Sequence, residues 1–218
     1  MTDLEIFARV DHTLLRADAS WPEIRALCEE ALRFGAASAC IPPSYVRRAR
    51  AEFGEGLPIC AVIGFPLGYS VSAAKVLEAE RAAADGASEI DMVVNLGDVK
   101  NGCFGAVLDE AKAARKACEG KILKVIVEAC CLTLAEKEAL CRVVSEAGAD
   151  FIKTSTGFGS SGAALADIGL FRRHVGPGVR IKASGGIKTR ADMLAFIEAG
   201  ADRIGTSSAA RALAGGGC

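Results

Sequence analysis

A short signature recurs four times along the chain and constrains the fold more than any other feature. It reads RFGAASACIP at 33–42, ADGASEIDMV at 84–93, EAGADFIKTS at 146–155 and EAGADRIGTS at 198–207. Each copy ends an Ala-rich amphipathic stretch with a glycine, the residue that adopts a left-handed helix cap without steric cost. The apolar run that follows is short and free of turn residues, as in a strand buried on both faces. Each signature therefore predicts a junction from helix to parallel strand.

Further strands and helices fill the intervals between the signatures. Apolar runs predict strands near residues 57–66, 120–129 and 178–186, and a weaker one near 8–15. Amphipathic segments predict helices over 20–34, 43–53, 70–84, 103–118, 133–147, 163–174 and 189–199. At ~27 residues per unit, strand and helix alternate about eight times, which favours an α/β fold of the (β/α)8 TIM-barrel type. We expect a single domain over residues 1–218. The alternative is an open doubly wound sheet, but no GxGxxG follows the first strand.

Composition excludes several classes of protein. Hydrophobic residues make up 51% and charged residues 24%, which excludes an intrinsically disordered chain. Lys and Arg total 26 against 27 Asp and Glu, a balance that argues against binding to nucleic acid or to an anionic membrane. No apolar run is long enough to cross a membrane, and the start lacks a signal peptide. Nine cysteines without a CxxC favour a reduced cytoplasmic protein over a disulfide framework or a zinc site. Because aromatic residues are only 6%, aliphatic side chains are expected to fill the core.

Two lysines lie at the same level of neighbouring predicted strands. Lys153 follows two apolar residues in FIKTSTG, and Lys182 lies in VRIKASGG. Because the active site of a βα barrel lies at the C-terminal ends of its strands, both amines are expected at one rim. Their repulsion should lower the pKa of at least one amine, which could then attack a carbonyl and form a Schiff base. In the structural alternative, the lysines point outward and reach water.

Three other polar side chains are expected near the same rim. Asp91 interrupts the apolar run of EIDMVV. It either forms a structural ion pair or moves protons with Lys182 next to the imine. Asp11 in VDHTLL either binds a ligand hydroxyl or caps a turn. Cys40 stands five residues after its signature glycine, but no His or Asn is obviously placed to activate it, so an inert buried thiol is the favoured interpretation.

Two loops near the end of the chain predict an anion site. Residues 184–186, Ser-Gly-Gly, follow the strand of Lys182, and residues 206–208, Thr-Ser-Ser, follow the last predicted strand. Both loops lead into helices, whose free N–H groups and dipoles favour anions, and barrels often bind phosphate at these positions. Ordinary turn glycines and helix caps are the alternative.

The motifs taken together resemble those of one enzyme family. VDHTLL, CIPPSYV, IGFPLG, EIDMVVNLG, FIKTSTGF, IKASGGI and RIGTSSA have the order and spacing of deoxyribose-phosphate aldolases, over about residues 9–209. These class I aldolases are βα barrels. The resemblance implies that the chain reversibly splits 2-deoxy-D-ribose 5-phosphate into acetaldehyde and D-glyceraldehyde 3-phosphate, with no metal and no cofactor other than the covalent imine.

The resemblance also implies roles for individual residues. Lys153 would form the Schiff base, and Lys182 and Asp91 would relay protons. The other substrate-binding residues would be Gly185, Gly186, Ser207 and Ser208 at the phosphate, together with Thr154, Cys40 and Asp11. The C-terminus departs from part of the family, because some members end in a tyrosine that assists proton transfer, whereas the last tyrosine here is Tyr69.

The expected partners are a phosphosugar and small aldehydes, with neither nucleic acid nor membrane, and a homodimer is a candidate assembly. Two other functions stay open. One is a transaldolase-like Schiff-base lyase that uses the same lysine with a different donor. The other is a phosphosugar-binding barrel without catalysis, against which the joint presence of Lys153, Lys182 and Asp91 argues.

Overall fold

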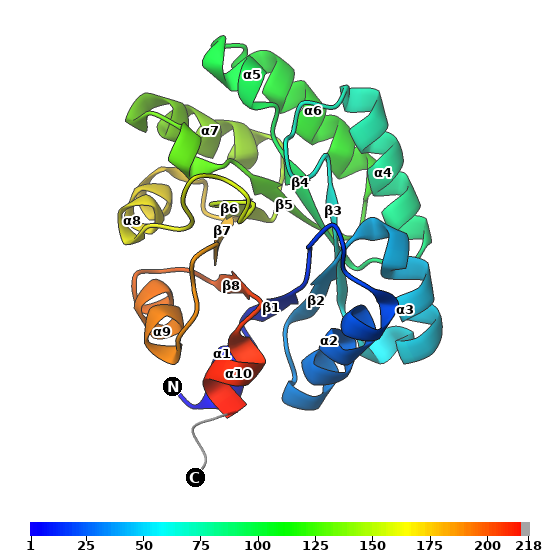
Figure 1. Cartoon of the computed structure of the whole chain (residues 1–218). Helices are drawn as coiled ribbons and strands as arrows, with labels where there is room; N and C mark the ends of the chain where they lie inside the picture. The colour runs from blue at the N-terminus through cyan, green and yellow to red at the C-terminus, as the bar shows by residue number, and fades with distance from the viewer. Residues whose placement is uncertain (215–218) are drawn as a thin grey trace.

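The strands form a closed barrel in which each strand pairs in parallel with the next and the last pairs with the first (Figure 1). The computed structural model describes residues 1–214 of the chain. Its strands are β1 (Val10–Thr13), β2 (Ser38–Ile41), β3 (Ile59–Ile63), β4 (Glu89–Val93), β5 (Ile122–Ile126), β6 (Phe151–Lys153), β7 (Arg180–Ser184) and β8 (Arg203–Thr206). The predicted eight-stranded βα barrel is therefore confirmed, and the open doubly wound sheet is excluded.

Helices surround the barrel and connect its strands (Figure 1). They are α1 (Asp3–Phe7), α2 (Trp21–Phe34), α3 (Val46–Phe53), α4 (Ser72–Ala84), α5 (Leu96–Lys100), α6 (Phe104–Ala117), α7 (Leu134–Glu146), α8 (Leu165–His174), α9 (Arg190–Glu198) and α10 (Ala209–Ala214). Each of the seven helices predicted above is present, whereas α1 and α5, with 5 residues each, are too short to produce a periodic pattern. Among the described residues, no helix combines the length and the apolar character that crossing a membrane requires.

The glycines of the four signatures make the predicted turns from helix to strand. Gly35, Gly86, Gly148 and Gly200 have φ values of 67°, 106°, 70° and 109°. Positive φ is strained for residues that carry a Cβ atom, so glycine at these positions lets the chain reverse at low cost. The recurring signature thus encodes the repeated step that builds the barrel.

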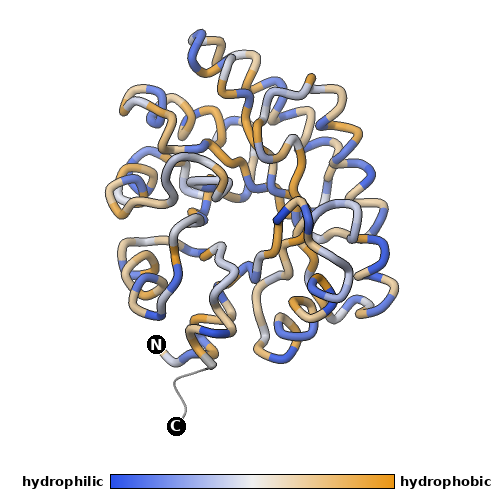
Figure 2. The backbone as a smooth tube through the Cα atoms, in the orientation of Figure 1, coloured by the Kyte–Doolittle hydropathy of each residue, from blue (hydrophilic) through white to orange (hydrophobic). Residues whose placement is uncertain are grey.

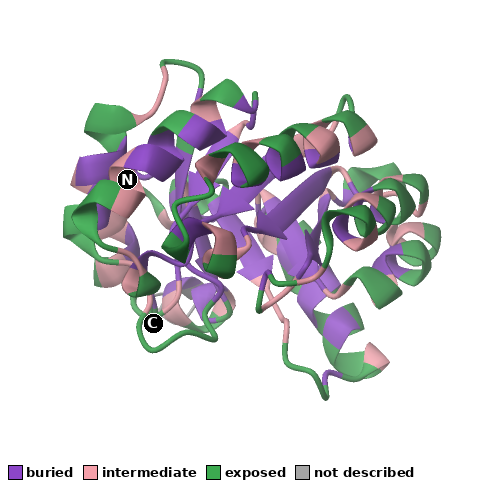
Figure 3. Cartoon of the chain, turned by 90° about the horizontal axis from the view of Figure 1, so that it is seen from above, coloured by how far each residue is buried: buried purple, intermediate pink, exposed green. Residues whose placement is uncertain are grey.

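Side chains alternate between two environments along each strand. In β4, Ile90 and Met92 belong to the main hydrophobic core, which lies between the strands and the helices, whereas Asp91 points into the barrel. The strands are buried at the centre, and exposed residues lie on the outer helices (Figure 3). Helices of the outer ring carry both hydrophobic and hydrophilic residues along their length (Figure 2). The expected aliphatic core is present, but it lies outside the barrel, and the barrel interior is charged instead.

A buried ion pair joins α4 to α6. The Nζ atom of Lys75, on α4, donates to Oε2 of Glu110 on α6 at 2.7 Å and to the carbonyl oxygen of Val93 at 2.9 Å. Ser72 donates its hydroxyl to the other Glu110 oxygen at 3.0 Å. The Lys75 side chain is fully buried and that of Glu110 is 5% exposed, so each charge depends on the other.

Replacement of Glu110 by alanine should destabilise the fold strongly. The Glu110→Ala variant leaves the Lys75 ammonium buried without its carboxylate, and we expect a loss of about 3–5 kcal/mol in the free energy of unfolding. The double variant Lys75→Met, Glu110→Leu should recover most of that loss, since it removes both charges. Urea unfolding of the three proteins measures this, and a Glu110→Ala variant as stable as the parent would contradict it.

Candidate active site

Lys153 and Lys182 lie side by side inside the barrel. Their Cα atoms are register partners on β6 and β7, as their equal level in the sequence predicts. Both Nζ atoms donate to the same oxygen, Oδ2 of Asp91, at 2.7 Å each. Lys153 is 2% exposed and Lys182 is fully buried. The alternative in which these lysines point outward to water is therefore wrong, and the structure places Asp91 between them.

A third lysine, Lys124 on β5, completes the coordination of Asp91. Lys124 is the register partner of Asp91, and its Nζ donates to Asp91 Oδ1 at 2.8 Å. It also lies 2.5 Å from Oε2 of Glu89 and 3.4 Å from Oδ2 of Asp11. The sequence analysis missed Lys124, although a lysine within the apolar run ILKVI is the same anomaly that marked the other two lysines.

Asp11 joins the same cluster from the opposite side. Its carboxylate contacts the ammonium of Lys182 and the guanidinium of Arg203, and it accepts a hydrogen bond from Ser38 Oγ at 2.8 Å. Arg203 also lies 3.2 Å from Glu89 Oε2. The buried cluster contains three acidic and four basic side chains: Asp11, Glu89, Asp91, Lys124, Lys153, Lys182 and Arg203. Mutual pairing is what makes so many buried charges tolerable.

The pKa values in the cluster are governed by these contacts. Burial alone would raise the pKa of Asp91, but Lys124, Lys153 and Lys182 hold it well below its ordinary value. Burial alone would lower the pKa of Lys182, but the carboxylates of Asp11 and Asp91 raise it above its ordinary value. Repulsion between the lysines therefore does not produce a lowered pKa at Lys182. Its two carboxylate partners outweigh its like-charged neighbours.

A cavity of about 430 Å³ opens above Lys153 at the C-terminal ends of the strands. The loops after β1, β6, β7 and β8 line it. Of the three predicted catalytic residues, Lys153 is the one that belongs to this lining. All four predicted phosphate residues line it as well: Gly185, Gly186, Ser207 and Ser208. Two basic residues of the lining, Arg16 and Lys188, were not identified from the sequence, because nothing in their local pattern separates them from ordinary surface charges. A second hollow, between Arg47 and Arg81 on the outer surface, contains none of the predicted residues.

Glycine at position 205 allows the close packing beside Lys182. A Cβ atom there would lie 2.8 Å from Cβ of Ser184 and 3.2 Å from Cε of Lys182. The first distance is shorter than real side chains tolerate. Gly205 on β8 therefore leaves room for the side chain of Lys182 on β7.

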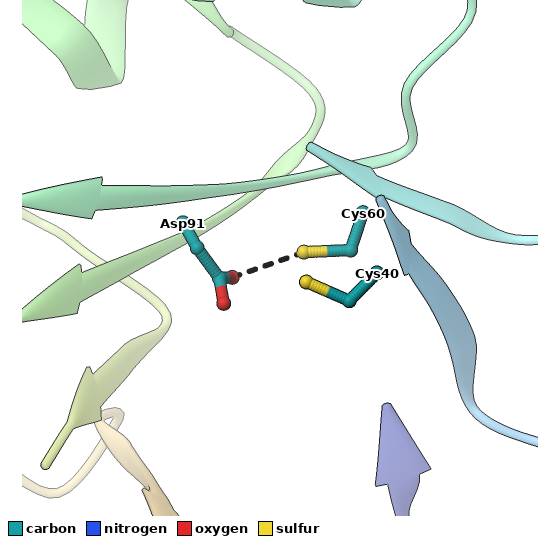
Figure 4. Close-up of side chains that lie close together, drawn as sticks. All are labelled: Cys40, Cys60 and Asp91. Atoms are coloured by element: carbon teal, nitrogen blue, oxygen red, sulfur yellow. Dashed lines mark hydrogen bonds between the residues drawn. The ribbon is translucent and has the colours of Figure 1, made fainter. Parts of the chain in front are cut away.

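Thr154, Cys40 and Asp11 lie beneath the cavity and do not line it. The Thr154 hydroxyl is engaged by Ser184, because it accepts from the Ser184 N–H at 3.1 Å and donates to the Ser184 carbonyl at 3.2 Å. Cys40 lies beside Cys60 and Asp91 in the barrel interior (Figure 4). These three side chains bring ligand atoms within 4.8 Å of one another, as do Asp11, Cys60 and Glu89, which is the spacing of a metal site. All of these carboxylates, however, already contact lysine ammonium groups.

Glu128 orders the loop that follows Lys153. Its backbone has φ 50°, and its carboxylate accepts from the N–H of Thr156 at 3.3 Å and contacts the Thr156 hydroxyl. Phe158, in the same loop, makes an edge contact with Phe65, with ring centroids 5.4 Å apart. Backbone strain at a non-glycine residue beside a cavity is typical of functional sites. The sequence analysis did not identify Glu128, since left-handed backbone at a glutamate has no sequence signal.

The paired carboxylates should make the stability of the fold depend on acid. The pKa values of Asp11 and Asp91 are lowered by folding, so their contribution to stability is present above their unfolded pKa, about 4, and is lost as the pH falls below it. The raised pKa of Lys182 acts in the opposite direction and only at high pH. We expect the free energy of unfolding to fall steeply from about pH 4 to pH 2. Urea midpoints measured across this range should fall less steeply for Asp11→Asn than for the parent. The control Asp18→Asn changes an exposed carboxylate, and its midpoints should fall as steeply as those of the parent. A stability independent of acid in the parent would contradict the pairing.

Comparison with known proteins gives relatives along almost the whole chain. The family described as DeoC/LacD family aldolase matches residues 6–214. The deoxyribose-phosphate aldolase of Clostridium botulinum (strain Eklund 17B / Type B) is 51% identical over 215 residues, covering 99% of this chain and 97% of that protein. That of Streptococcus pyogenes serotype M4 is 54% identical over 204 residues, covering 93% and 91%. The structure of the tetrameric deoxyribose phosphate aldolase from Aeropyrum pernix superposes with a TM-score of 0.89 at 34% identity, covering 98% of this chain and 91% of that chain.

These matches agree with the architecture and with the motifs. The similarity extends from before β1 into α10, so it includes every strand of the barrel and all the cavity loops. The family inferred from the motif order is confirmed. The chain belongs to the DeoC/LacD family of aldolases.

Proposed function

We propose that the chain catalyses the reversible cleavage of 2-deoxy-D-ribose 5-phosphate to acetaldehyde and D-glyceraldehyde 3-phosphate. The activity follows from the family and from relatives named deoxyribose-phosphate aldolase at 51% and 54% identity. The observation in the structure that carries the proposal is the position of Lys153. Its amine meets the cavity floor and lies 2.7 Å from Asp91 Oδ2, which is itself bonded to Lys182. An amine, a proton acceptor and a second cation are the groups that Schiff-base chemistry requires.

In the direction of synthesis, Lys153 attacks the carbonyl carbon of acetaldehyde. The attacking Nζ must first be without its extra proton, and Asp91 Oδ2 at 2.7 Å is the nearest acceptor that the structure offers. Addition forms a carbinolamine, and loss of water forms the imine. Because Asp91 also contacts Lys182 at 2.7 Å, a proton that Asp91 takes from Lys153 can move on to Lys182 as Lys182 releases one of its own protons to water.

The imine then becomes the nucleophile. A proton leaves the methyl carbon through Asp91, Lys182 and a water molecule, and the electron pair forms an enamine. The imine nitrogen accepts the charge in this step, so the reaction needs no metal ion as electron sink. The enamine carbon attacks the aldehyde of glyceraldehyde 3-phosphate, and hydrolysis of the new imine releases the sugar phosphate.

The phosphate is proposed to bind at the loops after β7 and β8, among Gly185, Gly186, Ser207 and Ser208. Gly185 and Gly186 have φ of 83° and 77°, a conformation that exposes backbone N–H groups in a tight turn. Lys188 adds a positive charge to the same lining. The other residues carried over from the resemblance, Thr154, Cys40 and Asp11, would act from beneath the cavity, by supporting the loops and the charged cluster. We also propose that the chain acts as one barrel domain in the cytoplasm, with small molecules as substrates.

Borohydride reduction in the presence of acetaldehyde should attach a two-carbon unit to Lys153. The imine forms at the amine that meets the cavity, and reduction makes the bond permanent. Mass spectrometry of the peptides locates the adduct. Lys153→Ala should abolish both labelling and turnover. Lys182→Ala should lower turnover by about two to four orders of magnitude, the usual contribution of a proton-transfer group.

The matched control is Lys116→Ala, which removes an exposed lysine of α6 and should leave labelling and turnover unchanged. Circular dichroism checks that each variant is folded. An unlabelled but folded parent enzyme would support the non-catalytic barrel, and labelling by dihydroxyacetone in preference to acetaldehyde would support a transaldolase-like lyase.

Removal of the charge at position 188 should weaken phosphate binding selectively. For Lys188→Ala we expect the KM for 2-deoxyribose 5-phosphate to rise about tenfold or more, as lost interactions with a charged group do. The kcat/KM for unphosphorylated 2-deoxyribose should stay at the parental value, since that substrate has no phosphate for Lys188 to contact. Equal effects on both substrates would show that Lys188 does not act on the phosphate.

A further inference from the structure

Two thiols lie side by side in the barrel interior. Cys40 on β2 and Cys60 on β3 are register partners on neighbouring parallel strands, and both are fully buried. Their sulfur atoms point the same way, toward Asp91 (Figure 4), and lie within 4.8 Å of each other and of its carboxylate. Neighbouring strands are about 4.8 Å apart, which is within the Cα separation of about 4.4–6.8 Å that a disulfide needs. The backbone therefore already permits a bond between the two sulfur atoms.

The two thiols are electrostatically unequal. Cys60 donates to Asp91 Oδ1 at 3.1 Å. Burial and the neighbouring Cys40 and Asp91 raise the pKa of Cys60 well above its ordinary value, because burial and nearby negative charge disfavour the thiolate. The neighbouring Cys60, together with the charges of Lys182 and Lys153, lowers the pKa of Cys40 against the effect of burial. One thiolate beside one thiol is the arrangement from which a disulfide forms in two steps.

The surrounding charges favour oxidation of this pair over the binding of a metal ion. Asp91 Oδ1 already bonds Lys124, and Asp91 Oδ2 bonds Lys153 and Lys182. A divalent cation would have to enter among these ammonium groups and compete with them for the carboxylate. The same positive charges stabilise a thiolate, which is the nucleophile in oxidation.

The pair lies one side-chain layer below the cavity. Leu15 and Phe65 pack against the small cluster of Cys40, Cys60 and Val62. Leu15 also lines the cavity in which the substrate is proposed to bind. Hydrogen peroxide has fewer heavy atoms than acetaldehyde, so an opening that admits the substrate admits the oxidant as well.

We propose that Cys40 and Cys60 form a modification site at which a peroxide produces a disulfide that slows the enzyme. The Cys40 thiolate attacks one oxygen of hydrogen peroxide, so the O–O bond breaks, an S–O bond forms and hydroxide leaves to become water. The Cys60 sulfur then attacks the Cys40 sulfur, so the S–O bond breaks and a second water leaves with the Cys60 proton. The two thiols lose two electrons in total, and the peroxide gains them.

The disulfide acts on the catalytic cluster through Asp91. Once bonded to Cys40, the sulfur of Cys60 has no proton to donate to Asp91 Oδ1, so the carboxylate loses one of its partners. Loss of a hydrogen bond to this charged group should lower turnover about tenfold or more. Reduction by a small dithiol should restore it. The expected loss of turnover rests on the proposed aldolase function, whereas formation of the disulfide between Cys40 and Cys60 does not.

The experiment uses a background in which the exposed cysteines Cys103 and Cys131, the half-exposed Cys130 and the terminal Cys218 are replaced by serine. Treatment with hydrogen peroxide should remove two hydrogen atoms from the intact mass and link the peptides that carry Cys40 and Cys60. Turnover should fall about tenfold and recover fully with dithiothreitol.

Two variants in the same background test the assignment, each compared with its own untreated rate. Cys60→Ser should form no cross-link, and its Cys40 should be trapped as sulfenic acid by dimedone. Cys40→Ser should form neither product. A fully active parent that gains oxygen at Cys40 without a cross-link, or that cross-links without losing turnover, would overturn the proposal. If the parent has no aldolase activity before treatment, the proposed function fails instead, and the cross-link still tests the modification site.

Discussion

The carboxylate of Asp91 is the centre on which the interior of this barrel depends. Three ammonium groups, from Lys124, Lys153 and Lys182, converge on its two oxygens at 2.7–2.8 Å. Each of these lysines comes from a different strand, so the carboxylate also joins β5, β6 and β7 to β4. Removing one charge from such a cluster leaves its partners buried without compensation. Structure and proposed chemistry therefore rest on the same contacts.

Along each strand the side chains alternate between two environments, the aliphatic core and the barrel interior. One set of side chains packs against the helices and forms the aliphatic core, and the other set meets inside the barrel and carries the charges. Lys153 lies where the charged interior meets the cavity, so one side of its amine contacts Asp91 and the other is available to a substrate. Substrate loops can then vary at the rim without disturbing the core on which the fold depends.

Anomalous residues in apolar strands proved to be the most informative signal in the sequence. Asp91, Lys153 and Lys182 were found in this way, and the structure brings all three into direct contact. Lys124 carries the same signal, in an apolar run that follows no signature glycine. Glu89 and Arg203 are harder to find, since a charged residue at the start of a strand is common. The raised pKa of Lys182 could not be predicted from the sequence, because it depends on which carboxylates lie nearest in space.

The sequence by itself determined the repeated turn from helix to strand, because glycine and apolar runs act locally, and with it the barrel and the level of each lysine along its strand. The family followed from the order of the motifs. Tertiary structure alone decided which charges meet across the barrel, which residues line the cavity and that Cys40 lies beside Cys60. These contacts join different strands, and they depend on the register and closure of the whole sheet.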